Sequence, residues 1–452
     1  MSNIQIYIPD VVQDIIQKLN NANYEAYVCG GAVRDSLMNK TPHDWDICTS
    51  ALPEDVMGIF KNEEIIPTGL QHGTVTLIID KIPYEITTFR VDGEYTDSRH
   101  PDSVEFTTDI VKDLSRRDFT INAMAYHPEK GLIDPFNGCE DIQKKIIRTV
   151  GNAEERFRED PLRILRAIRF SLKMKFAIHY HTLFGIKTCY FLLKNISKER
   201  ITSEINQMII YSNFHKEFLN NSDIFSLIIP ELKDCITFDQ NNPYHIYTVY
   251  DHISCSLSYA PNDLIVKLAL LFHDIGKPKC QHFDDFGVGH FHGHAKISAE
   301  IADKRLKELK YDNETRIKVV ELISYHDVTF VYTEKEIKKC VKRWLNKIGE
   351  EQFRRLLNIR IADILAQNPE YALNRLNNIY KLLNALEEVL KEKECFTLKD
   401  LLINGTDLID MGIKEGKQIG IILNTLLEKV IDGELENNKE VLLQHVEENF
   451  SK

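Results

Sequence analysis

Features of export and membrane proteins are missing from this sequence of 452 residues. No stretch has the roughly 20 apolar residues needed to span a bilayer. The start, MSNIQIYIPDVVQDII, lacks the basic region and apolar core of a signal peptide. The nine cysteines stand singly, without a CxxC pair or a compact even framework, so neither a zinc site nor a disulfide scaffold is predicted. We expect reduced thiols and a cytoplasmic protein that does not bind a membrane.

The sequence also lacks the overall positive charge common in nucleic-acid-binding proteins, because its formal net charge is −12. The distribution of charge changes this interpretation. Between Asp141 and Asn220, 15 Lys and Arg stand against 8 Asp and Glu, a local charge of +7, so the rest of the chain carries −19. Because Lys and Arg neutralise phosphates, this segment predicts a basic surface for RNA.

Length and pattern predict an α+β head followed by helical domains. The hydrophobic content of 43% and charged content of 27% are those of a folded globular protein with more than one core. β-branched and aromatic runs predict strands at 27–29, 44–48, 74–79 and 84–89. After residue 140 strand patterns nearly vanish and apolar residues recur at helical spacing. We predict a head with a small mixed sheet (1–140), then an all-α neck (141–225), body (226–370) and tail (371–452).

Two motifs in the head suit a nucleotide and a metal. Gly30 and Gly31 stand at a predicted strand-to-helix turn, where backbone N–H groups and Arg34 could reach a triphosphate. Asp44 and Asp46 lie two apart on a predicted strand, so both carboxylates should face the same side. Paired carboxylates are suitable ligands for Mg²⁺. Each motif alone also fits an ordinary turn or solvated aspartates.

The complete string GGAVRDSLMNKTPHDWDICTS resembles the motif of the class II tRNA nucleotidyltransferases and bacterial poly(A) polymerases, in the polymerase-beta-like superfamily. The resemblance implies that Asp44 and Asp46 hold catalytic Mg²⁺ and that Gly31 and Arg34 contact the nucleotide phosphates. Glu85 could add a third carboxylate, but its alternation with Ile86 favours a solvent-facing residue.

Two further strings extend the resemblance. The segment RRDFTINAM resembles the family motif for ribose and phosphates, which implies nucleotide binding by Arg117, Asp118 and Asn122. EDPLR resembles the motif that selects the incoming base with protein groups, which assigns that role to Asp160 and Arg163. Arg163, Arg166 and Arg169 recur every three residues, and Asp160 precedes Arg163 at the same spacing, so the four residues should lie along one side of a predicted helix. The resemblance places Arg166 and Arg169 nearer the triphosphate. A basic amphipathic helix with salt bridges is the structural alternative.

The resemblance implies tRNA, ATP and CTP as partners, but close relatives differ in what they add. The segment 90–101 resembles a flexible loop of members that can add A, which disfavours pure CC addition. Full CCA addition, A addition alone and poly(A) synthesis stay open. We favour CCA addition because it is the commonest activity of this architecture.

A second set of residues predicts a metal site in the body. HDIGK with spaced His and Asp resembles the HD-domain phosphohydrolases. That resemblance implies one metal on His252, His273, Asp274 and Asp363, with His294 and His326 completing a second site. Imidazole and carboxylate suit Mn, Fe, Co or Ni, and such a metal would activate water for attack on a phosphate ester. An idle site kept for architecture is the alternative.

Other functional classes stay open on the sequence alone. The chain could be a nucleotide or RNA phosphohydrolase whose head only binds ligand, or an RNA-binding protein without catalysis. The retained pair Asp44 and Asp46 disfavours the last of these. The oligomeric state, the contacts of the tail with tRNA and the substrate of the HD site do not follow from the sequence.

Overall fold

The computed structural model describes residues 5–67, 69–93, 103–334 and 336–450. The chain divides into two compact units, Met1–Tyr211 and Ser212–Lys452. The division falls inside the segment 141–225 predicted as the neck. The four domain boundaries drawn from the sequence remain predictions.

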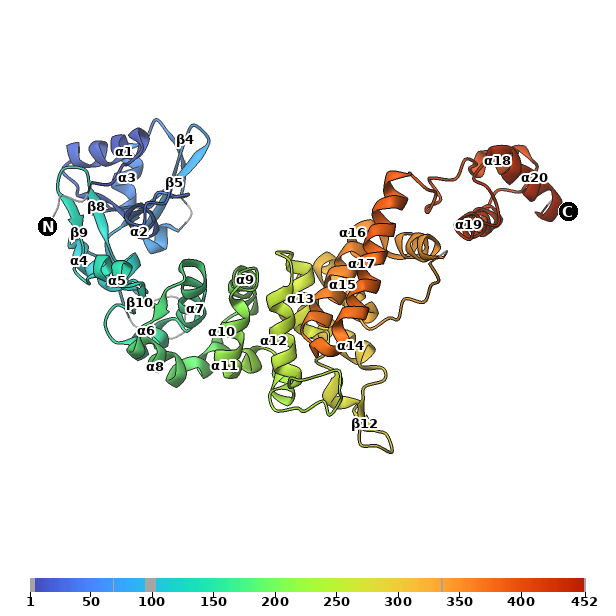
Figure 1. The fold of residues 1–452 in the computed structure, drawn as a ribbon. Helices are drawn as coiled ribbons and strands as arrows, with labels where there is room; N and C mark the ends of the chain where they lie inside the picture. The colour runs from blue at the N-terminus through green and yellow to red at the C-terminus, as the bar shows by residue number, and fades with distance from the viewer. Residues whose placement is uncertain (1–4, 68, 94–102, 335, 451–452) are drawn as a thin grey trace. The chain divides into compact units, whose positions relative to one another are not determined.

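The first unit contains a mixed sheet of seven strands in the order β3-β4-β5-β2-β1-β8-β9 (Figure 1). Its strands are β1 (Ala26–Cys29), β2 (Ile47–Thr49), β3 (Glu64–Ile66), β4 (Thr74–Ile79), β5 (Ile82–Thr88), β8 (Ala125–His127) and β9 (Gly131–Ile133). β2 pairs with β5 in parallel, whereas the other neighbours are antiparallel. A separate ladder joins β6 (Arg90–Asp92) to β7 (Val104–Phe106). The predicted mixed sheet is therefore confirmed.

Both faces of the central strand β1 are buried, because its side chains alternate between two apolar clusters. Ala26 and Val28 belong to a core with α1 and α3, whereas Tyr27 and Cys29 belong to a second core on the other face with α4. The helices of the head are α1 (Asp10–Asn21), α2 (Gly31–Leu37), α3 (Pro53–Ile59), α4 (Ile110–Ser115) and α5 (Gly138–Lys144). The covered sheet is a rigid base for residues at its strand ends.

The rest of the first unit is helical except for one short parallel ladder. Its helices are α6 (Ala153–Glu159), α7 (Leu162–Met174), α8 (Tyr180–Cys189) and α9 (Lys198–Ile209). β10 (Ile146–Ile147) pairs with β11 (Ala177–Ile178). α7 buries apolar residues such as Leu165 and Ile168 and packs on α9. The helical neck predicted from sequence is confirmed, with this small ladder in addition.

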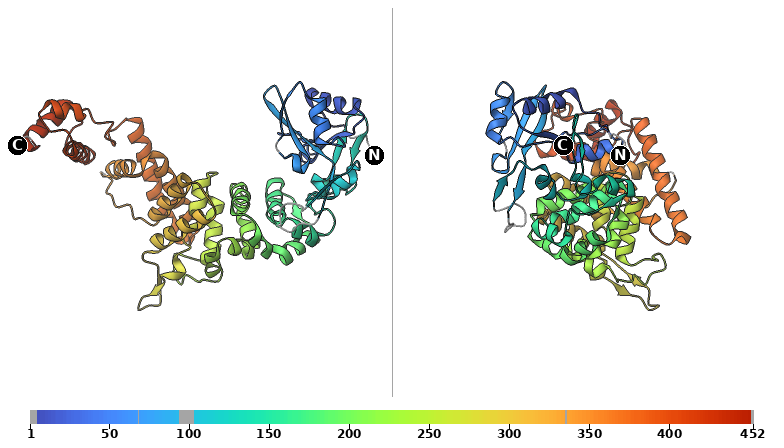
Figure 2. Two further views of the ribbon diagram at one scale, coloured as in Figure 1. Left: turned by 180° about the vertical axis from the view of Figure 1, so that it is seen from behind. Right: turned by 90° about the vertical axis from the view of Figure 1, so that its left-hand side faces the viewer.

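The second unit is helical apart from the hairpin of β12 (His282–Phe283) and β13 (Gly289–His290), which projects from the helices in both views of Figure 2. Its helices are α10 (Phe214–Asn220), α11 (Ser222–Ile228), α12 (Val249–Tyr259), α13 (Leu264–Phe272), α14 (His294–Glu308), α15 (Asn313–Tyr325), α16 (Ile337–Leu365), α17 (Pro369–Lys391), α18 (Gly405–Asp410), α19 (Lys417–Ile431) and α20 (Lys439–Phe450). α16 is interrupted at Gly349, where the backbone is not helical. The last three helices share a separate apolar core.

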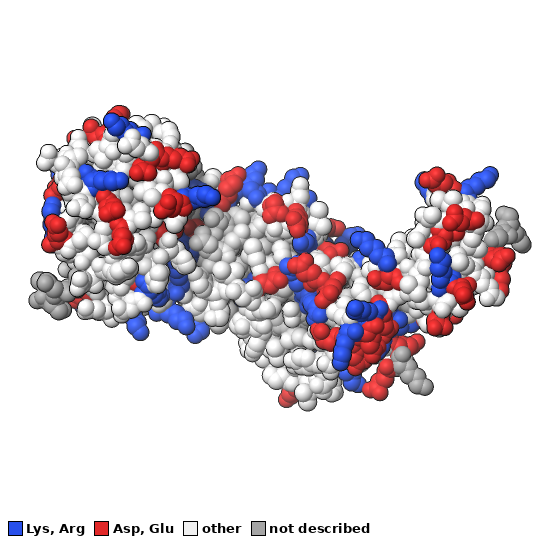
Figure 3. Space-filling model, turned by 90° about the horizontal axis from the view of Figure 1, so that it is seen from above, with Lys and Arg blue, Asp and Glu red and all other residues white. Residues whose placement is uncertain are grey.

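Charged side chains of both signs are interspersed over the face drawn in Figure 3. Not every arginine of the basic segment contributes fully to the surface. Arg169 is buried, and Arg163 and Arg200 are partly buried and line a cavity. Within the described residues, none of the helices combines the length and apolarity required to cross a bilayer.

Candidate functional site

The two aspartates of the D-x-D motif precede β2 and do not lie on it, so the predicted strand at 44–48 was wrong in its bounds. Strand pairing starts at Ile47 because the partner β1 ends at Cys29, where Gly30 turns the chain with a φ of 69°. The carbonyl oxygen of Asp46 still accepts a bond of 3.0 Å from the backbone N–H of Cys29. Asp46 lines a cavity of about 490 Å³, whereas Asp44 is not among its lining residues.

Carboxylates crowd around Asp46. Glu85 on β5 is exposed, as the alternation predicted, and it also lines the same cavity. Partial desolvation, followed by the negative charges of Glu85 and Asp44, raises the pKa of Asp46 above its ordinary value. A divalent cation would relieve this repulsion, so the donor set fits Mg²⁺.

The glycine pair lets an arginine approach the sheet closely. A Cβ at Gly30 would lie 2.7 Å from Nη1 of Arg117, so only glycine provides both the space and the positive φ. α2 begins at Gly31, and its Arg34 is buried. Arg34 donates to Oδ1 of Asn122 at 2.6 Å and to Asp35 at 2.8 Å. Gly31, Arg34 and Asn122 all line the cavity.

Asp118 is paired on both carboxylate oxygens. Arg166 donates to Oδ2 from Nε at 2.9 Å and from Nη2 at 2.6 Å, and Asn122 donates to Oδ1 at 3.0 Å. Burial opposes ionisation, but the charge of Arg166 prevails and lowers the pKa of Asp118 to about 2. The RRD segment and the arginine row of α7 therefore meet through this ion pair.

Asp160 lies in the break between α6 and α7 and does not share a helix with the arginines, which corrects the predicted single row. Its extended backbone follows Glu159, and Pro161 precedes the first residue of α7. Arg200 on α9 donates to both oxygens of Asp160, at 3.3 and 2.7 Å. Arg163 instead bonds Glu159 at 2.6 Å and the carbonyl oxygen of Arg116 at 3.0 Å.

Arg169 does not reach the cavity, contrary to the expectation that it lies nearer the triphosphate. It is buried and donates to Glu204 of α9 at 2.6 Å. With a repeat of 3.6 residues, a row spaced by three drifts around the helix, so its third member faces the neighbouring helix. Nine of the eleven residues predicted for this site nevertheless line one cavity, the exceptions being Asp44 and Arg169.

The sequence-based site omitted several residues of the same cavity. They are Glu85, which was considered and set aside, and Arg116, Phe170 and Arg200. The ring of Phe170 lies under the guanidinium groups of Arg34, Arg166 and Arg169 at 5.4, 5.5 and 4.6 Å. Arg200 is in a helix more than 30 residues downstream, without a local pattern that would mark it. The cavity thus carries six arginines and four acidic residues.

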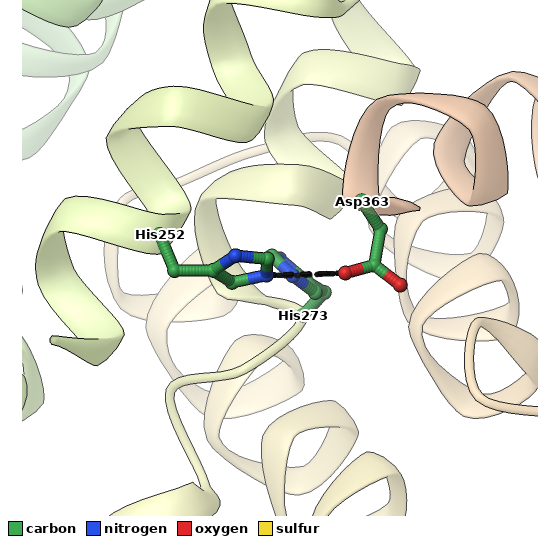
Figure 4. Close-up of side chains that lie close together, drawn as sticks. All are labelled: His252, His273 and Asp363. Carbon is green, nitrogen blue, oxygen red and sulfur yellow. Dashed lines mark hydrogen bonds and ion pairs between the residues drawn. The ribbon is translucent and has the colours of Figure 1, made fainter. Parts of the chain in front are cut away.

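A second group of buried side chains forms in the helical unit. His252 on α12 and His273 directly after α13 face each other with their Nε2 atoms 3.2 Å apart. Oδ1 of Asp363, from α16, lies 3.1 Å from Nε2 of His252 (Figure 4). Asp274, His294 and His326 form a neighbouring buried group whose ligand atoms also converge.

The tautomers of the four histidines follow from their Nδ1 contacts. His252 bonds the carbonyl oxygen of Ala366 at 3.1 Å, and the other three bond the carbonyl oxygen three residues earlier at 2.7 to 2.8 Å. Carbonyl oxygens only accept, so each Nδ1 donates, and a ring that carries no second proton directs its Nε2 lone pair inward. Facing lone pairs at 3.2 and 3.1 Å are suited to metal cations between them.

Asp274 belongs to both groups, which modifies the predicted ligand sets. Its Oδ2 lies 3.3 Å from Nε2 of His252, and its Oδ1 lies 3.3 Å from Nε2 of His294. The prediction placed it only with His252, His273 and Asp363. Burial lowers the pKa of His273 to about 4, so this ring is neutral at pH 7. The pKa of His294 is raised, because Asp274 outweighs the effect of burial.

The HDIGK turn packs closely on α14. A Cβ at Gly276 would lie 2.8 Å from the backbone nitrogen of Ser298, so glycine permits this approach. Lys277 is buried and contacts Oδ2 of Asp274 at 2.7 Å. These groups border a second cavity of about 400 Å³, which His245 and Arg375 also line. Sequence analysis identified neither of them, because each is a single residue outside a motif.

The segment resembling a loop of A-adding relatives is only partly described. Arg90–Asp92 forms β6, whereas 94–102 lies outside the described residues.

Comparison with known proteins covers almost the whole chain. The family described as "Poly A polymerase head domain" matches residues 26–148. Two further matches are to the families described as "Probable RNA and SrmB- binding site of polymerase A" (175–236) and "tRNA nucleotidyltransferase domain 2 putative" (290–446). The CCA-adding enzyme of Limosilactobacillus reuteri is 32% identical over 96% of this chain and 95% of its own, and that of Lactobacillus helveticus is 33% identical over 98% of each chain.

Solved structures agree with these matches. The CCA-adding enzyme of Bacillus stearothermophilus in complex with CTP is 28% identical, with a TM-score of 0.66 and coverage of 97% of both chains. The Thermotoga maritima CCA-adding enzyme complexed with tRNA, at 21% identity and a TM-score of 0.61, shares the fold. Sheet, cavity and matches together define a nucleotidyltransferase with a poly(A)-polymerase-type head. Within that class, the chain belongs to the family of CCA-adding enzymes.

Proposed function

We propose that this protein adds C, C and A to the 3′ end of tRNA, using CTP and ATP without a nucleic-acid template. The observation that carries the proposal is one cavity in which Asp46 and Glu85 lie with arginines and with Asp160 and Arg163 of the neck. Family membership and the relatives solved with CTP and with tRNA support it. A addition alone and poly(A) synthesis are the alternatives.

The carboxylates and the arginines have separate tasks in this proposal. Asp44 and Asp46, with Glu85 beside them, hold Mg²⁺, which supplies charge stabilisation for the attacking 3′-hydroxyl and the leaving pyrophosphate. Arg34, Arg117 and Arg166 pair with phosphate oxygens. Burial opposes the charge of Arg117, but Cys29 and Asp113 raise its pKa, so it stays cationic. Asp118 and Asn122 orient these cations. Asp118 also accepts a hydrogen bond from a ribose hydroxyl group, and Asn122 accepts or donates one.

Base selection follows from the donor and acceptor chemistry of Asp160 and Arg163. A carboxylate accepts a hydrogen bond from the exocyclic amino group of C or A, and a guanidinium donates to ring or carbonyl acceptors. Within the chain, Arg200 donates to Asp160, and Arg163 donates to Glu159. A carboxylate has further lone pairs and a guanidinium has further N–H groups, so Asp160 and Arg163 can bond a base while these contacts hold them in place.

Three tRNAs that stop before the first C, the second C and the final A test the proposal. With single nucleoside triphosphates and Mg²⁺, we expect CMP on the first two and AMP on the third, with addition ending after A. AMP on the third tRNA only would support A addition, and long A tails would support poly(A) synthesis. A tRNA that already ends in CCA is the control and should gain nothing.

A second activity is favoured by the four converging Nε2 atoms and the bridging Asp274. We infer a phosphohydrolase centre in which His252, His273 and Asp363 hold one metal and His294, His326 and Asp274 a second. The metal, among Mn, Fe, Co and Ni, supplies an activated water for attack on a phosphate ester. Asp274 positions both sites, and Lys277 compensates its charge.

Hydrolysis of p-nitrophenyl phosphate tests this centre. We expect turnover by protein loaded with Mn²⁺ or Ni²⁺, and a loss of about 100-fold or more for His273→Ala, because a ligand and its lone pair are removed. Metal content should fall in the same variant. His215→Ala is the matched control, since His215 is only partly buried and lies outside both groups. Equal turnover by wild type and His273→Ala would contradict the proposal.

A further inference from the structure

One arginine of the second cavity has a positive charge without a compensating acid. Arg375 lies on α17 and lines the cavity beside the histidine groups. Its Nη1 donates to Oε1 of Gln367, and across the described part of the chain it forms no ion pair with Asp or Glu. Lys277, the other cation that lines this cavity, is instead paired with Asp274 at 2.7 Å. Arg375 is therefore the cation that can take up an external anion.

The amide of Gln367 fixes where Arg375 points. Gln367 is buried, and its Nε2 donates to Oδ1 of Asp363 at 2.8 Å. The reverse orientation would place an amide oxygen against a carboxylate, so Oε1 must face the guanidinium. Arg375 is thus linked through one side chain to a residue of the histidine group. Side chains on a helix lean toward its N-terminus, and that end of α17, at Pro369, lies two residues after Gln367.

We propose that Arg375 binds the phosphoryl group of a phosphomonoester in this cavity. The inference rests on the proposed phosphohydrolase centre and names the substrate class of that site. A guanidinium offers parallel N–H donors that match two oxygens of a phosphate. A monoester has three non-bridging oxygens, so the third stays free to face the histidine groups. A diester has only two, so bidentate pairing with Arg375 would leave it without a further non-bridging oxygen for the histidine groups.

Hydrolysis would break the ester P–O bond with water as the nucleophile. The alcohol leaves with a proton from that water, and inorganic phosphate remains. This product keeps the oxygens that Arg375 contacts, so inorganic phosphate is a direct probe of the site and does not depend on turnover.

The test measures binding of inorganic phosphate by titration calorimetry to the full-length, Mn²⁺-loaded protein. We expect Arg375→Ala to weaken binding by about 10-fold or more, because a charge-assisted bond is lost, and Arg375→Lys to recover part of it. Arg354→Ala is the matched control, since Arg354 is an exposed arginine of α16 paired with Glu350 and Glu387. Mn²⁺ content should be equal in all variants. Equal Mn²⁺ content reports that the histidine groups are folded in each variant, and nucleotide incorporation into tRNA reports the same for the first unit.

The outcomes separate this inference from the hydrolase proposal. Phosphate binding that depends on Arg375 in a protein without turnover would support the inference and reject the hydrolase. Turnover with unchanged KM and phosphate affinity in Arg375→Ala would overturn the inference and leave the hydrolase intact. A nucleoside monophosphate and a 3′-phosphorylated oligonucleotide, each competing with inorganic phosphate, distinguish a free nucleotide from an RNA end. Displacement by neither would also overturn it.

Discussion

Replacement of Asp46 by Asn should reduce incorporation of CMP and AMP into tRNA by about 1,000-fold or more. The reason is that Asp46 is the D-x-D carboxylate that lines the arginine-rich cavity, and its neighbours Glu85 and Asp44 already raise its pKa. Removal of its charge leaves the remaining carboxylates with a weaker hold on Mg²⁺. The measurement is single-turnover incorporation of labelled nucleotide at saturating tRNA.

Two matched variants serve as controls for the Asp46→Asn prediction. Asp80→Asn replaces an exposed aspartate at the β4–β5 turn of the same sheet, where Asn tolerates the positive φ, and should leave incorporation unchanged. Asp274→Ala should also spare incorporation, because it lies in the other unit. If Asp46→Asn kept wild-type rates, the assignment of this cavity to catalysis would be wrong. If Asp274→Ala abolished incorporation in a folded protein, the two centres could not be separate.

Replacement of Arg163 or Asp160 by Ala should remove base choice and retain chemistry. We expect the preference for CTP and ATP over UTP and GTP to fall by about 10-fold to 100-fold, since one good pair of base-edge hydrogen bonds discriminates by about 1–3 kcal/mol. The rate with CTP itself should fall less, because the carboxylates and the phosphate-binding arginines remain. Competition between nucleotide pairs on one tRNA measures the ratio directly.

Arg200→Ala should produce a smaller loss of the same kind. Arg200 holds both oxygens of Asp160, and without it the carboxylate is free to rotate away from the base edge. Arg148→Ala is the control, because Arg148 forms a comparable pair with Asp141 outside the cavity. Undiminished discrimination in Arg163→Ala would count against protein-based selection at this site.

Three of the four histidines make a local hydrogen bond that ordinary histidines also make. His273, His294 and His326 do bond carbonyl oxygens three residues earlier, as ordinary capping or turn histidines can. The same bonds fix the tautomer that directs Nε2 inward. The same hydrogen bond therefore occurs in an ordinary capping histidine and in a histidine whose Nε2 faces a metal site. The spacing of histidines in the sequence could not distinguish these two cases.

The sequence by itself determined the class of the head and the α+β and helical division. Most of the residues it predicted for the two sites lie together in the first cavity and in the two histidine groups. The sequence could do this because motif residues such as Gly30, Asp46 and Asp274 lie within short strings whose chemistry is local. Only the tertiary structure decided which partners those residues have. Arg200 reaches Asp160 from 40 positions away, Arg169 turns to Glu204, and Asp274 faces two histidine groups at once. Such contacts depend on how helices pack across the fold, and no pattern along the chain encodes that packing residue by residue.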